Sequence, residues 1–395
     1  MHAMSSKLHS SASDAIPVTS STTDPEKDQL ATAAQLGSHF ITKPGALLKG
    51  GRYKIIRKLD QSHYSSTFLV EDLQFTSPNF KYLAAKILSA DATKLNGTHE
   101  LEILLKVSER EVGYLEPHLP VLCDHFAQEG LYGLHYCFLN RLFSSDVNAF
   151  RASAPTGRLG VHIIKPIIAC TVEALQRLHS RNIIHADNKA DNILFTGPGT
   201  DKIEKTIDKN PPLVDGTFTF DNTEYSIPRS EPFQPGISWD VTPYMAELIT
   251  VYLSNLGAVA FWADKPKPLG DIGAFALRAP ENTIRSECGK EIDIWAVGCM
   301  GKPCPNVIDQ SRVRDKFFSP EGHFIKSSAN VYPNRSMKER FTKRCGDDLT
   351  ERRINAAAQF ISDCLRLNPR DRPTVDELRM HSWLAMAFMG CADHN

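Results

Sequence analysis

Residues 183–194 read IIHADNKADNIL, and this stretch decides the fold prediction. Two apolar pairs flank a polar loop that carries Asp187, Lys189 and Asn192 at set intervals. Phosphoryl transfer needs positioned charges rather than covalent help from the protein. In such a loop Asp187 can accept a hydroxyl proton, Lys189 can steady the transferred group, and Asn192 can hold a metal ion. A polar turn between two strands is the alternative interpretation.

The composition of the whole chain excludes several classes of protein. Its 395 residues are 42% hydrophobic, which is enough for a core and excludes a wholly disordered chain. Lys and Arg number 45 against 46 Asp and Glu, so general electrostatic binding to nucleic acid or to an anionic membrane is not expected. We find no apolar run long enough for a transmembrane helix and no secretory signal. The 9 cysteines are scattered without a CxxC pair, which favours a reducing compartment.

The order of the predicted elements divides the chain into a strand-rich part and a helical part. Residues 1–45 are rich in Ser, Thr and Ala, and we expect a disordered tail there, with order beginning near Gly50. Residues 196–245 form a polar insertion that we expect to be a mobile excursion. Strands are predicted at 52–60, 64–72, 82–89, 119–127, 132–142 and 248–253, and helices at 99–109, 160–181, 355–367, 374–380 and from 383 onward.

The string H-x-D-x-K-x-x-N-I-L closely resembles the catalytic loop of protein kinases. In kinases such a loop follows a strand lysine that pairs with a helix glutamate. Lys86 and Glu100 occur in that order before the loop. Downstream, the segments Ala-Pro-Glu at 279–281 and Asp-Ile-Trp at 293–295 precede Arg372, again in kinase order. The resemblance implies that Glu281 and Arg372 pair to anchor the substrate segment and that Asp293 holds the catalytic-loop backbone. It covers roughly residues 50 to 385.

Within the kinases the chain looks most like the SR-protein-kinase group, which phosphorylates Ser in Arg/Ser-rich splicing factors. A small residue, Ala186, replaces Arg after His185, although that group carries Thr there. The insertion before the next motif and the segment at 252–258 also support this likeness.

The resemblance implies an α+β, bilobal fold with a small β-rich lobe over 46–142 and a larger, mostly helical lobe over 143–395. It implies ATP and Mg²⁺ as cofactors, a protein substrate for which Arg/Ser-rich splicing factors are the candidates, and a cytoplasmic or nuclear location, with no direct binding to nucleic acid or membrane. The catalytic residues it implies are Asp187 and Lys189, the metal ligands Asn192 and Asn255, and the nucleotide contacts Leu59, Thr67, Ala84, Lys86 and Glu100.

The metal-binding Asp-Phe-Gly segment of kinases is altered in this chain. Asp215-Gly216 keeps an aspartate but follows two prolines, whereas Asn255-Leu256-Gly257 follows a predicted strand and lies nearer to Ala279. We choose Asn255 for this position and keep a swing of Asp215 into the site as the alternative. An amide oxygen offers only a dipole where a carboxylate offers a full charge, so we expect weaker metal affinity.

Two further departures concern the phosphate-covering loop and a central helix. The glycine positions of the loop align with Asp60, Ser62 and Ser65, and glycine is what lets backbone N–H groups approach phosphate. The apolar helix after Asp293 is predicted to stop at Met300, because glycine and prolines follow. One hypothesis is a missing or mis-joined coding segment, which a transcript with an apolar continuation after 299 would support.

These observations leave three hypotheses. The first is an active protein Ser/Thr kinase with reduced activity, favoured by the retained Lys86, Asp187 and Asn192. The second is a pseudokinase that serves as a binding or scaffolding module, favoured by Asn255 and the glycine-free loop. The third, a phosphotransferase for small molecules, shares the loop pattern, but the Ala-Pro-Glu segment and its arginine argue against it.

Overall fold

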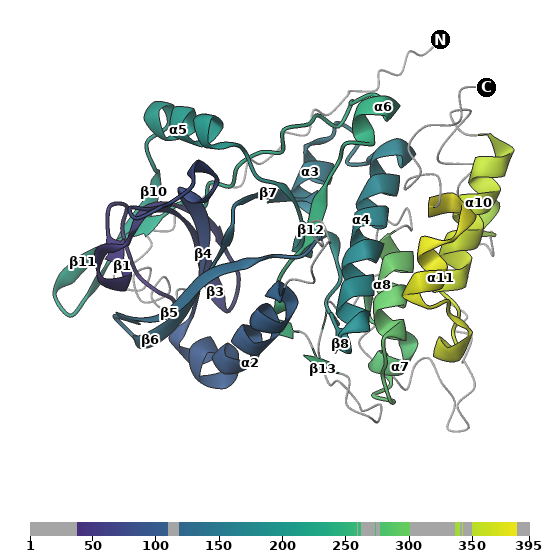
Figure 1. Ribbon diagram of the computed structural model, residues 1–395, viewed down its shortest axis with the longest axis horizontal. Coiled ribbons are helices and arrows are strands. Elements are labelled where there is room, and N and C mark those ends of the chain that lie inside the picture. Colours follow the sequence, from purple (N-terminus) through teal and green to yellow (C-terminus); the bar gives the residue numbers. More distant parts are fainter. Residues whose placement is uncertain are drawn as a thin grey trace, which may run out of the picture.

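The computed structural model describes residues 38–109, 118–258, 260–261, 273, 277–300, 336–339, 342 and 350–384. A strand-rich half formed by the first part of the chain lies beside a helical half formed by the second part (Figure 1). The predicted α+β class is therefore confirmed.

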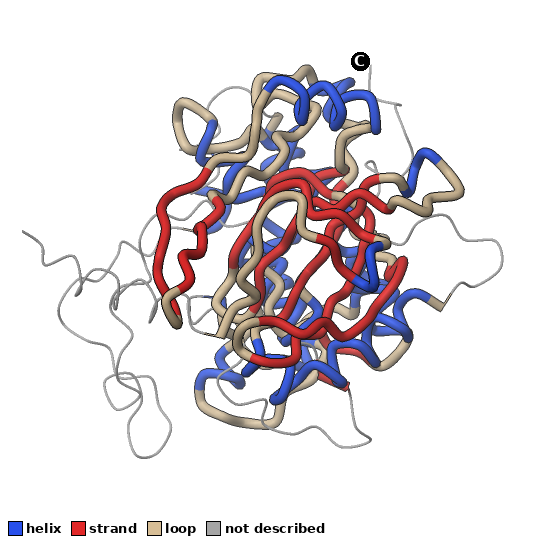
Figure 2. Tube along the Cα trace, turned by 90° about the vertical axis from the view of Figure 1, so that its left-hand side faces the viewer, coloured by secondary structure: helices blue, strands red, loops and turns tan. Residues whose placement is uncertain are grey.

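The strand-rich half is built on an antiparallel six-stranded sheet in the order β1-β2-β3-β4-β6-β5 (Figure 2). Alternate residues of a strand face opposite sides. Phe68 and Ala85 therefore point to one face, and Thr67 and Lys86, paired in the same ladder, point to the other. The strands are β1 Leu47–Leu48, β2 Tyr53–Gln61, β3 Ser65–Asp72, β4 Tyr82–Leu88, β5 Leu122–Gly130 and β6 Gly133–Arg141.

Helix α2, Ala90–Ser108, packs beside β6 and begins earlier than the sequence predicted. The pattern at 99–109 marks only its second half. Ser89 caps the true start, because its hydroxyl accepts a hydrogen bond from the Ala92 N–H, and Asp91 suits the positive end of the helix dipole.

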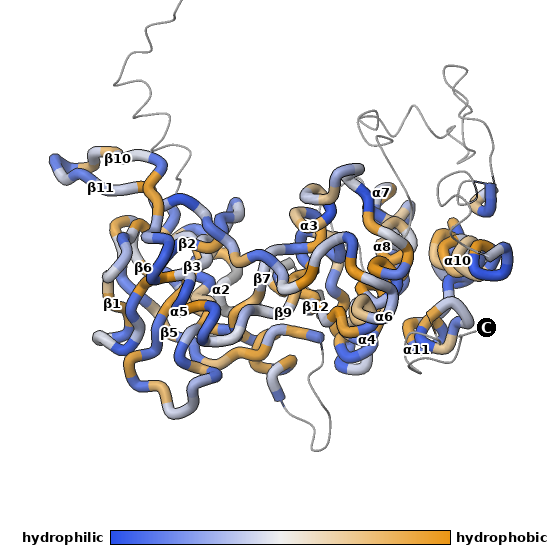
Figure 3. Tube along the Cα trace, turned by 90° about the horizontal axis from the view of Figure 1, so that it is seen from above, coloured by the Kyte–Doolittle hydropathy of each residue, from blue (hydrophilic) through white to orange (hydrophobic). Residues whose placement is uncertain are grey.

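The helical half surrounds α4, whose buried face carries Ile163, Ile167, Leu175 and Leu178. Helices α8, α10 and α11 cover this core, and in Figure 3 the side of α10 toward α8 is apolar while its outer side is polar. The bounds are α3 Val147–Ser153, α4 Val161–Ser180, α6 Pro243–Ala246, α7 Pro280–Thr283, α8 Glu291–Met300, α10 Glu351–Cys364 and α11 Val375–Arg379. Among the described helices, none has the length and apolarity needed to cross a bilayer.

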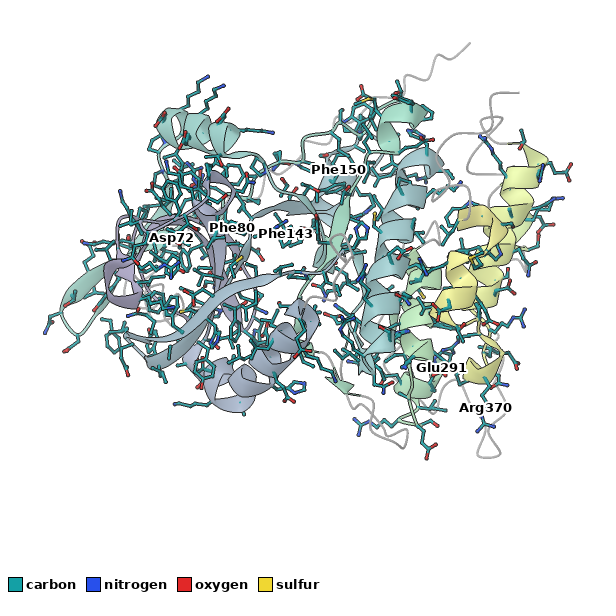
Figure 4. All side chains as sticks on the ribbon, viewed as in Figure 1. Asp72, Phe80, Phe143, Phe150, Glu291 and Arg370 are labelled. Carbon is teal, nitrogen blue, oxygen red and sulfur yellow. The ribbon has the colours of Figure 1, made fainter. Side chains whose placement is uncertain are left out.

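Short strands carry the loops that meet between the two halves. A three-stranded sheet has the order β12-β9-β7, and β13 pairs with β8. The bounds are β7 Phe143–Asp146, β8 Ile183–Ile184, β9 Ile193–Thr196, β12 Val251–Leu253 and β13 Ala260–Phe261, with 3-10 turns η3 Ala190–Asn192 and η4 Leu256–Ala258. Phe143, which packs on Tyr252 with ring centroids 4.8 Å apart, lies between the two halves (Figure 4).

The expectation of a mobile excursion at 196–245 was wrong. The insertion folds into helix α5, Thr200–Lys209, and a hairpin of β10, Val214–Phe220, and β11, Thr223–Pro228. Its Ile203 and Phe233 are buried in one apolar cluster with Leu59 and Leu142 of the sheet half. A few well-placed apolar side chains therefore hold a largely polar segment against the sheet.

The ordered part of the chain begins earlier than the sequence predicted. Residues 38–45, expected to be part of the disordered tail, are ordered: His39 and Phe40 are buried, and Phe40 belongs to the core on one face of the sheet. Residues 1–37 lie outside the described residues.

Helix α8 ends at Met300. The hypothesis of a missing coding segment depends on residues 301–335, which also lie outside the described residues.

Candidate active site

Lys86 on β4 and Glu100 on α2 form an ion pair in which Nζ lies 2.5 Å from Oε1. Glu100 is buried, so the pair fixes the helix against the sheet. Gly257 of η4 packs against the same carboxylate, where a Cβ would come within 2.8 Å of Oε2. A larger residue at 257 would therefore displace the Glu100 carboxylate from its present position.

Asn255 connects this pair to the catalytic loop. Its Oδ1 accepts a hydrogen bond from Lys86 Nζ at 3.4 Å, and its Nδ2 donates to Asn192 Oδ1 at 3.2 Å. The backbone of Asn255 is left-handed, with φ at 64°, a conformation that asparagine adopts more readily than most residues. Asp215 instead lies on β10, where Arg229 Nε contacts its Oδ1 at 2.5 Å.

Two side chains of the catalytic loop, those of Asn192 and Lys189, position Asp187. Asn192 Nδ2 donates to both the Asp187 backbone carbonyl, at 2.7 Å, and its Oδ2, at 2.9 Å. Lys189 Nζ also lies 2.9 Å from that Oδ2. These contacts hold the Asp187 carboxylate in one orientation in the loop, and a general base must be positioned in this way.

Asp293, fully buried on α8, holds the backbone that precedes Asp187. Its two oxygens accept from the N–H groups of His185 and Ala186, both at 2.9 Å, and one also bonds His179. Ala186 is left-handed, with φ at 64°, which is costly for alanine. The two hydrogen bonds to a buried carboxylate stabilise that strained turn.

His185 supports the loop as a neutral imidazole. Burial lowers its pKa. Its Nε2 lies 3.0 Å from the Ser254 carbonyl oxygen, which can only accept, so Nε2 carries the proton. Nδ1 is then free to accept the Asp187 N–H at 3.3 Å. The imidazole thus bridges the catalytic loop to the residue before Asn255.

The other residues expected to contact the nucleotide lie on the same face of the sheet as Lys86. Thr67 pairs with Lys86 across the β3–β4 ladder. Leu59 is buried in an apolar cluster with Phe233, and Ala84 packs against that cluster.

Phe233 is a site residue that sequence reasoning missed. Its carbonyl accepts the Ser145 N–H at 2.8 Å, and two residues earlier Glu231 N donates to the Lys58 carbonyl at 3.0 Å. The insertion therefore binds to both β2 and β7, next to the apolar cluster that contains Leu59. A lone aromatic between Pro232 and Pro235 was the only sequence signal.

The segment that follows the site is anchored by a buried, bidentate ion pair. Arg372 Nη1 and Nη2 lie 2.5 and 2.8 Å from the two oxygens of Glu281. The guanidinium also stacks over Trp295, 4.9 Å from the ring centroid, and donates to the Glu291 carbonyl at 2.9 Å. Figure 4 labels Glu291, the first residue of α8, whose carbonyl Arg372 contacts. Both partners of the pair are almost fully buried.

Comparisons with known proteins agree with this geometry. The chain is 28% identical to SRSF protein kinase 3 of Mus musculus over 162 residues, which are 40% of this chain and 28% of that protein. It is 22% identical to the serine/threonine-protein kinase SKY1 of Saccharomyces cerevisiae over 304 residues, 75% of this chain and 37% of that protein. Protein kinase dsk1 of Schizosaccharomyces pombe is 30% identical over 147 residues, 36% of this chain and 26% of that protein.

The chain resembles the protein kinases of the SRPK-like group. A solved crystal structure of a kinase domain matches 88% of this chain and 99% of its own, with a TM-score of 0.58 and 18% identity, which shows the shared fold. No family model matches the chain. The matches to these three SRPK-like relatives span between 26% and 37% of their length.

The turn at residues 62–65, which corresponds to the phosphate-covering turn of kinases, is held by hydrogen bonds within the turn itself. Ser62 Oγ accepts from the N–H groups of Tyr64 and Ser65, at 3.3 and 3.1 Å, and the Ser62 N–H bonds the Ser65 carbonyl at 2.9 Å. These backbone donors are therefore already engaged. A phosphate would have to displace the Ser62 hydroxyl to reach two of them.

The two metal ligands predicted from the sequence, Asn192 and Asn255, fit a divalent cation weakly. Asn192 Oδ1 already accepts a hydrogen bond from the amide nitrogen of Asn255, at 3.2 Å. Within the described residues, no group of three or more His, Cys, Asp or Glu could hold a metal. Mg²⁺ is usually held by one or two carboxylates together with substrate phosphates, so ATP itself would have to complete the coordination shell.

Asn188, next to Asp187, is a second residue that sequence reasoning missed. It is only 2% exposed, and within the described part of the chain neither atom of its amide has a hydrogen-bond partner. It lines a small cavity of about 20 Å³ between the catalytic loop and residues 277–282.

We predict that Asn188→Leu raises the free energy of unfolding by about 1–3 kcal/mol, because it removes a buried polar group without a partner while keeping a similar volume. Urea unfolding measures the change. A variant less stable than the wild type would show that this amide has a stabilising partner in solution.

Proposed function

We propose that this chain is a protein serine/threonine kinase that transfers the ATP γ-phosphate to a protein hydroxyl, with weakened metal binding. The observation that carries the proposal is the unbroken set of contacts from Glu100 through Lys86, Asn255 and Asn192 to Asp187. Such a set supports phosphoryl transfer because positioning and charge supply most of the catalysis.

Each side chain has one role in this proposal. Lys86, held by Glu100, binds phosphate oxygens of ATP. Asp187 accepts the proton of the attacking hydroxyl, and Lys189 neutralises charge on the transferred group. Asn192 and Asn255 would hold Mg²⁺, which supplies neutralisation of the phosphate charge. The Glu281–Arg372 pair positions the segment against which the peptide binds.

We propose Arg/Ser-rich proteins as substrates, and a cytoplasmic or nuclear location, by analogy with the SRPK-like relatives. The mouse relative is named for SRSF proteins, which supports this choice of substrate. An Arg/Ser peptide is therefore the first substrate to test.

The second candidate function is a pseudokinase that binds partners without transferring phosphate. Two features favour it. Asn255 carries an amide in place of a carboxylate, and the N–H groups of the turn at Ser62 already form hydrogen bonds within the turn. Both weaken nucleotide and metal binding while leaving the fold intact.

The experiment that separates the two functions is thermal shift by ATP with increasing Mg²⁺, on the wild type and Asn255→Asp. We expect the wild type to show a Mg²⁺-dependent shift, and the variant to bind Mg²⁺-ATP about tenfold more tightly because a charge replaces a dipole, a difference of about 1.4 kcal/mol.

Asn182→Asp is the matched control, because Asn182 is an exposed, left-handed asparagine outside the site. It should leave the ATP shift unchanged. A wild type with no shift at any Mg²⁺ concentration, beside a clear shift in Asn255→Asp, would favour the pseudokinase instead.

A further inference from the structure

The insertion links strands β2 and β7 through its residues 231–233. The Glu231 N–H donates to the Lys58 carbonyl on β2 at 3.0 Å, and the Ser145 N–H on β7 donates to the Phe233 carbonyl at 2.8 Å. Strand β2 belongs to the six-stranded sheet, and β7 belongs to the short strands between the two halves. Phe233 therefore lies where the two halves meet.

A buried arginine of β2 holds this link in place. Arg57 is 3% exposed, its Nη2 donates to the Asn210 carbonyl at 2.5 Å, and its Nη1 lies 3.7 Å from Glu231 Oε1. The other carboxylate oxygen of Glu231 accepts the Leu213 N–H at 3.0 Å. The insertion is thus attached to the sheet on both sides of its hairpin, and a side chain that is already fixed loses little entropy when a ligand binds to it.

The side chain of Phe233 packs on the face of the sheet that carries Lys86. It is 6% exposed and belongs to one apolar cluster with Leu59 and Leu142, against which Ala84 packs. Ala84 precedes Lys86 by two residues on β4, so both side chains point to the same face and their Cα atoms lie about 7 Å apart. Phe233 therefore adds an aromatic ring to the apolar surface on which the kinase resemblance places the nucleotide.

We propose that Phe233 is a nucleotide contact supplied by the insertion, and that its ring packs against the base of ATP beside Leu59 and Ala84. The inference rests on the proposed function, because it takes Lys86 as the residue that binds the phosphates. An aromatic ring stacks on the flat face of a base, and the loss of one such contact changes affinity about tenfold. The phosphates gain nothing from the ring, so Phe233 contributes to base affinity and Lys86 to phosphate affinity.

The test is titration calorimetry of the full chain with ATP and with inorganic tripolyphosphate, which lacks a base, both in the presence of Mg²⁺. Phe233→Ala should lower the affinity for ATP by about tenfold and leave the affinity for tripolyphosphate unchanged. Phe220→Ala is the matched control, because Phe220 belongs to the same insertion but is 41% exposed. It should bind both ligands as the wild type does.

A second variant covers the case in which Phe233→Ala does not fold. Phe233→Leu keeps an apolar side chain in the cluster but removes the flat ring, so it should also bind ATP more weakly and tripolyphosphate unchanged. An equal loss for the two ligands would show that Phe233 acts through the fold and would overturn the proposal. Unchanged ATP affinity would also overturn it, and so would tighter ATP binding, which would show that the ring occupies the place of the base.

Phosphate incorporation into the Arg/Ser peptide, measured on the same samples, separates this inference from the proposed function. ATP affinity that depends on Phe233 in a chain without phosphate transfer would support the base contact and contradict the kinase activity. Phosphate transfer by a chain whose ATP affinity is independent of Phe233 would support the kinase activity and overturn the base contact.

Discussion

Asp187→Asn should lower phosphate incorporation into an Arg/Ser peptide by about 10²–10⁴-fold, the usual contribution of general acid–base catalysis. Asparagine keeps the size of the side chain and can still accept the hydrogen bond from Asn192. It cannot take up the hydroxyl proton, so the loss reports on proton transfer rather than on folding. The measurement is the initial rate of γ-phosphate transfer from labelled ATP.

Asp191→Asn is the matched control for this experiment. Asp191 lies in the same loop but is exposed, and its Oδ1 accepts from the Asn148 amide at 2.9 Å. It should retain most of the rate. If Asp187→Asn kept the wild-type rate at an unchanged melting temperature, Asp187 would not be the base.

Arg372→Met should lower the free energy of unfolding by about 3–5 kcal/mol, because it leaves the Glu281 carboxylate buried without its partner. Methionine keeps much of the apolar stem, so the loss reflects the unpaired charge and the lost carbonyl contacts. Urea unfolding measures the change.

The control for this second prediction is Arg366→Met. The Arg366–Asp363 pair has a 2.5 Å contact as well, but its arginine side chain is 50% exposed. An exposed pair contributes about 0–1 kcal/mol, so this variant should be close to the wild type. Equal losses of unfolding free energy in the two variants would show that the buried Glu281–Arg372 pair stabilises the fold no more than an exposed pair does.

The parts of the site that the sequence predicted are those set by short spacing along the chain. Asp187, Lys189 and Asn192 lie within one loop, so their proximity follows from the pattern itself. The sequence order also suggested the contact between Lys86 and Glu100, which the structure shows between β4 and α2.

The features that the sequence did not predict depend on contacts between distant segments. Ile203 and Phe233 stand among polar residues, and nothing local shows that the sheet will bury them. Phe40 lies in a segment that is polar on average, and only its packing on the sheet orders it. The start of α2 at Ala90 was missed because its first half is less regularly apolar than its second.

Calorimetric binding of Mg²⁺-ATP to Lys86→Met tests most directly whether these side chains form one nucleotide site. We predict that the wild type binds and that the variant binds at least about tenfold more weakly, since one charge-assisted contact to phosphate is lost. Lys94→Met, an exposed lysine on α2, should match the wild type. No binding by the wild type, or equal binding by Lys86→Met, would contradict the account.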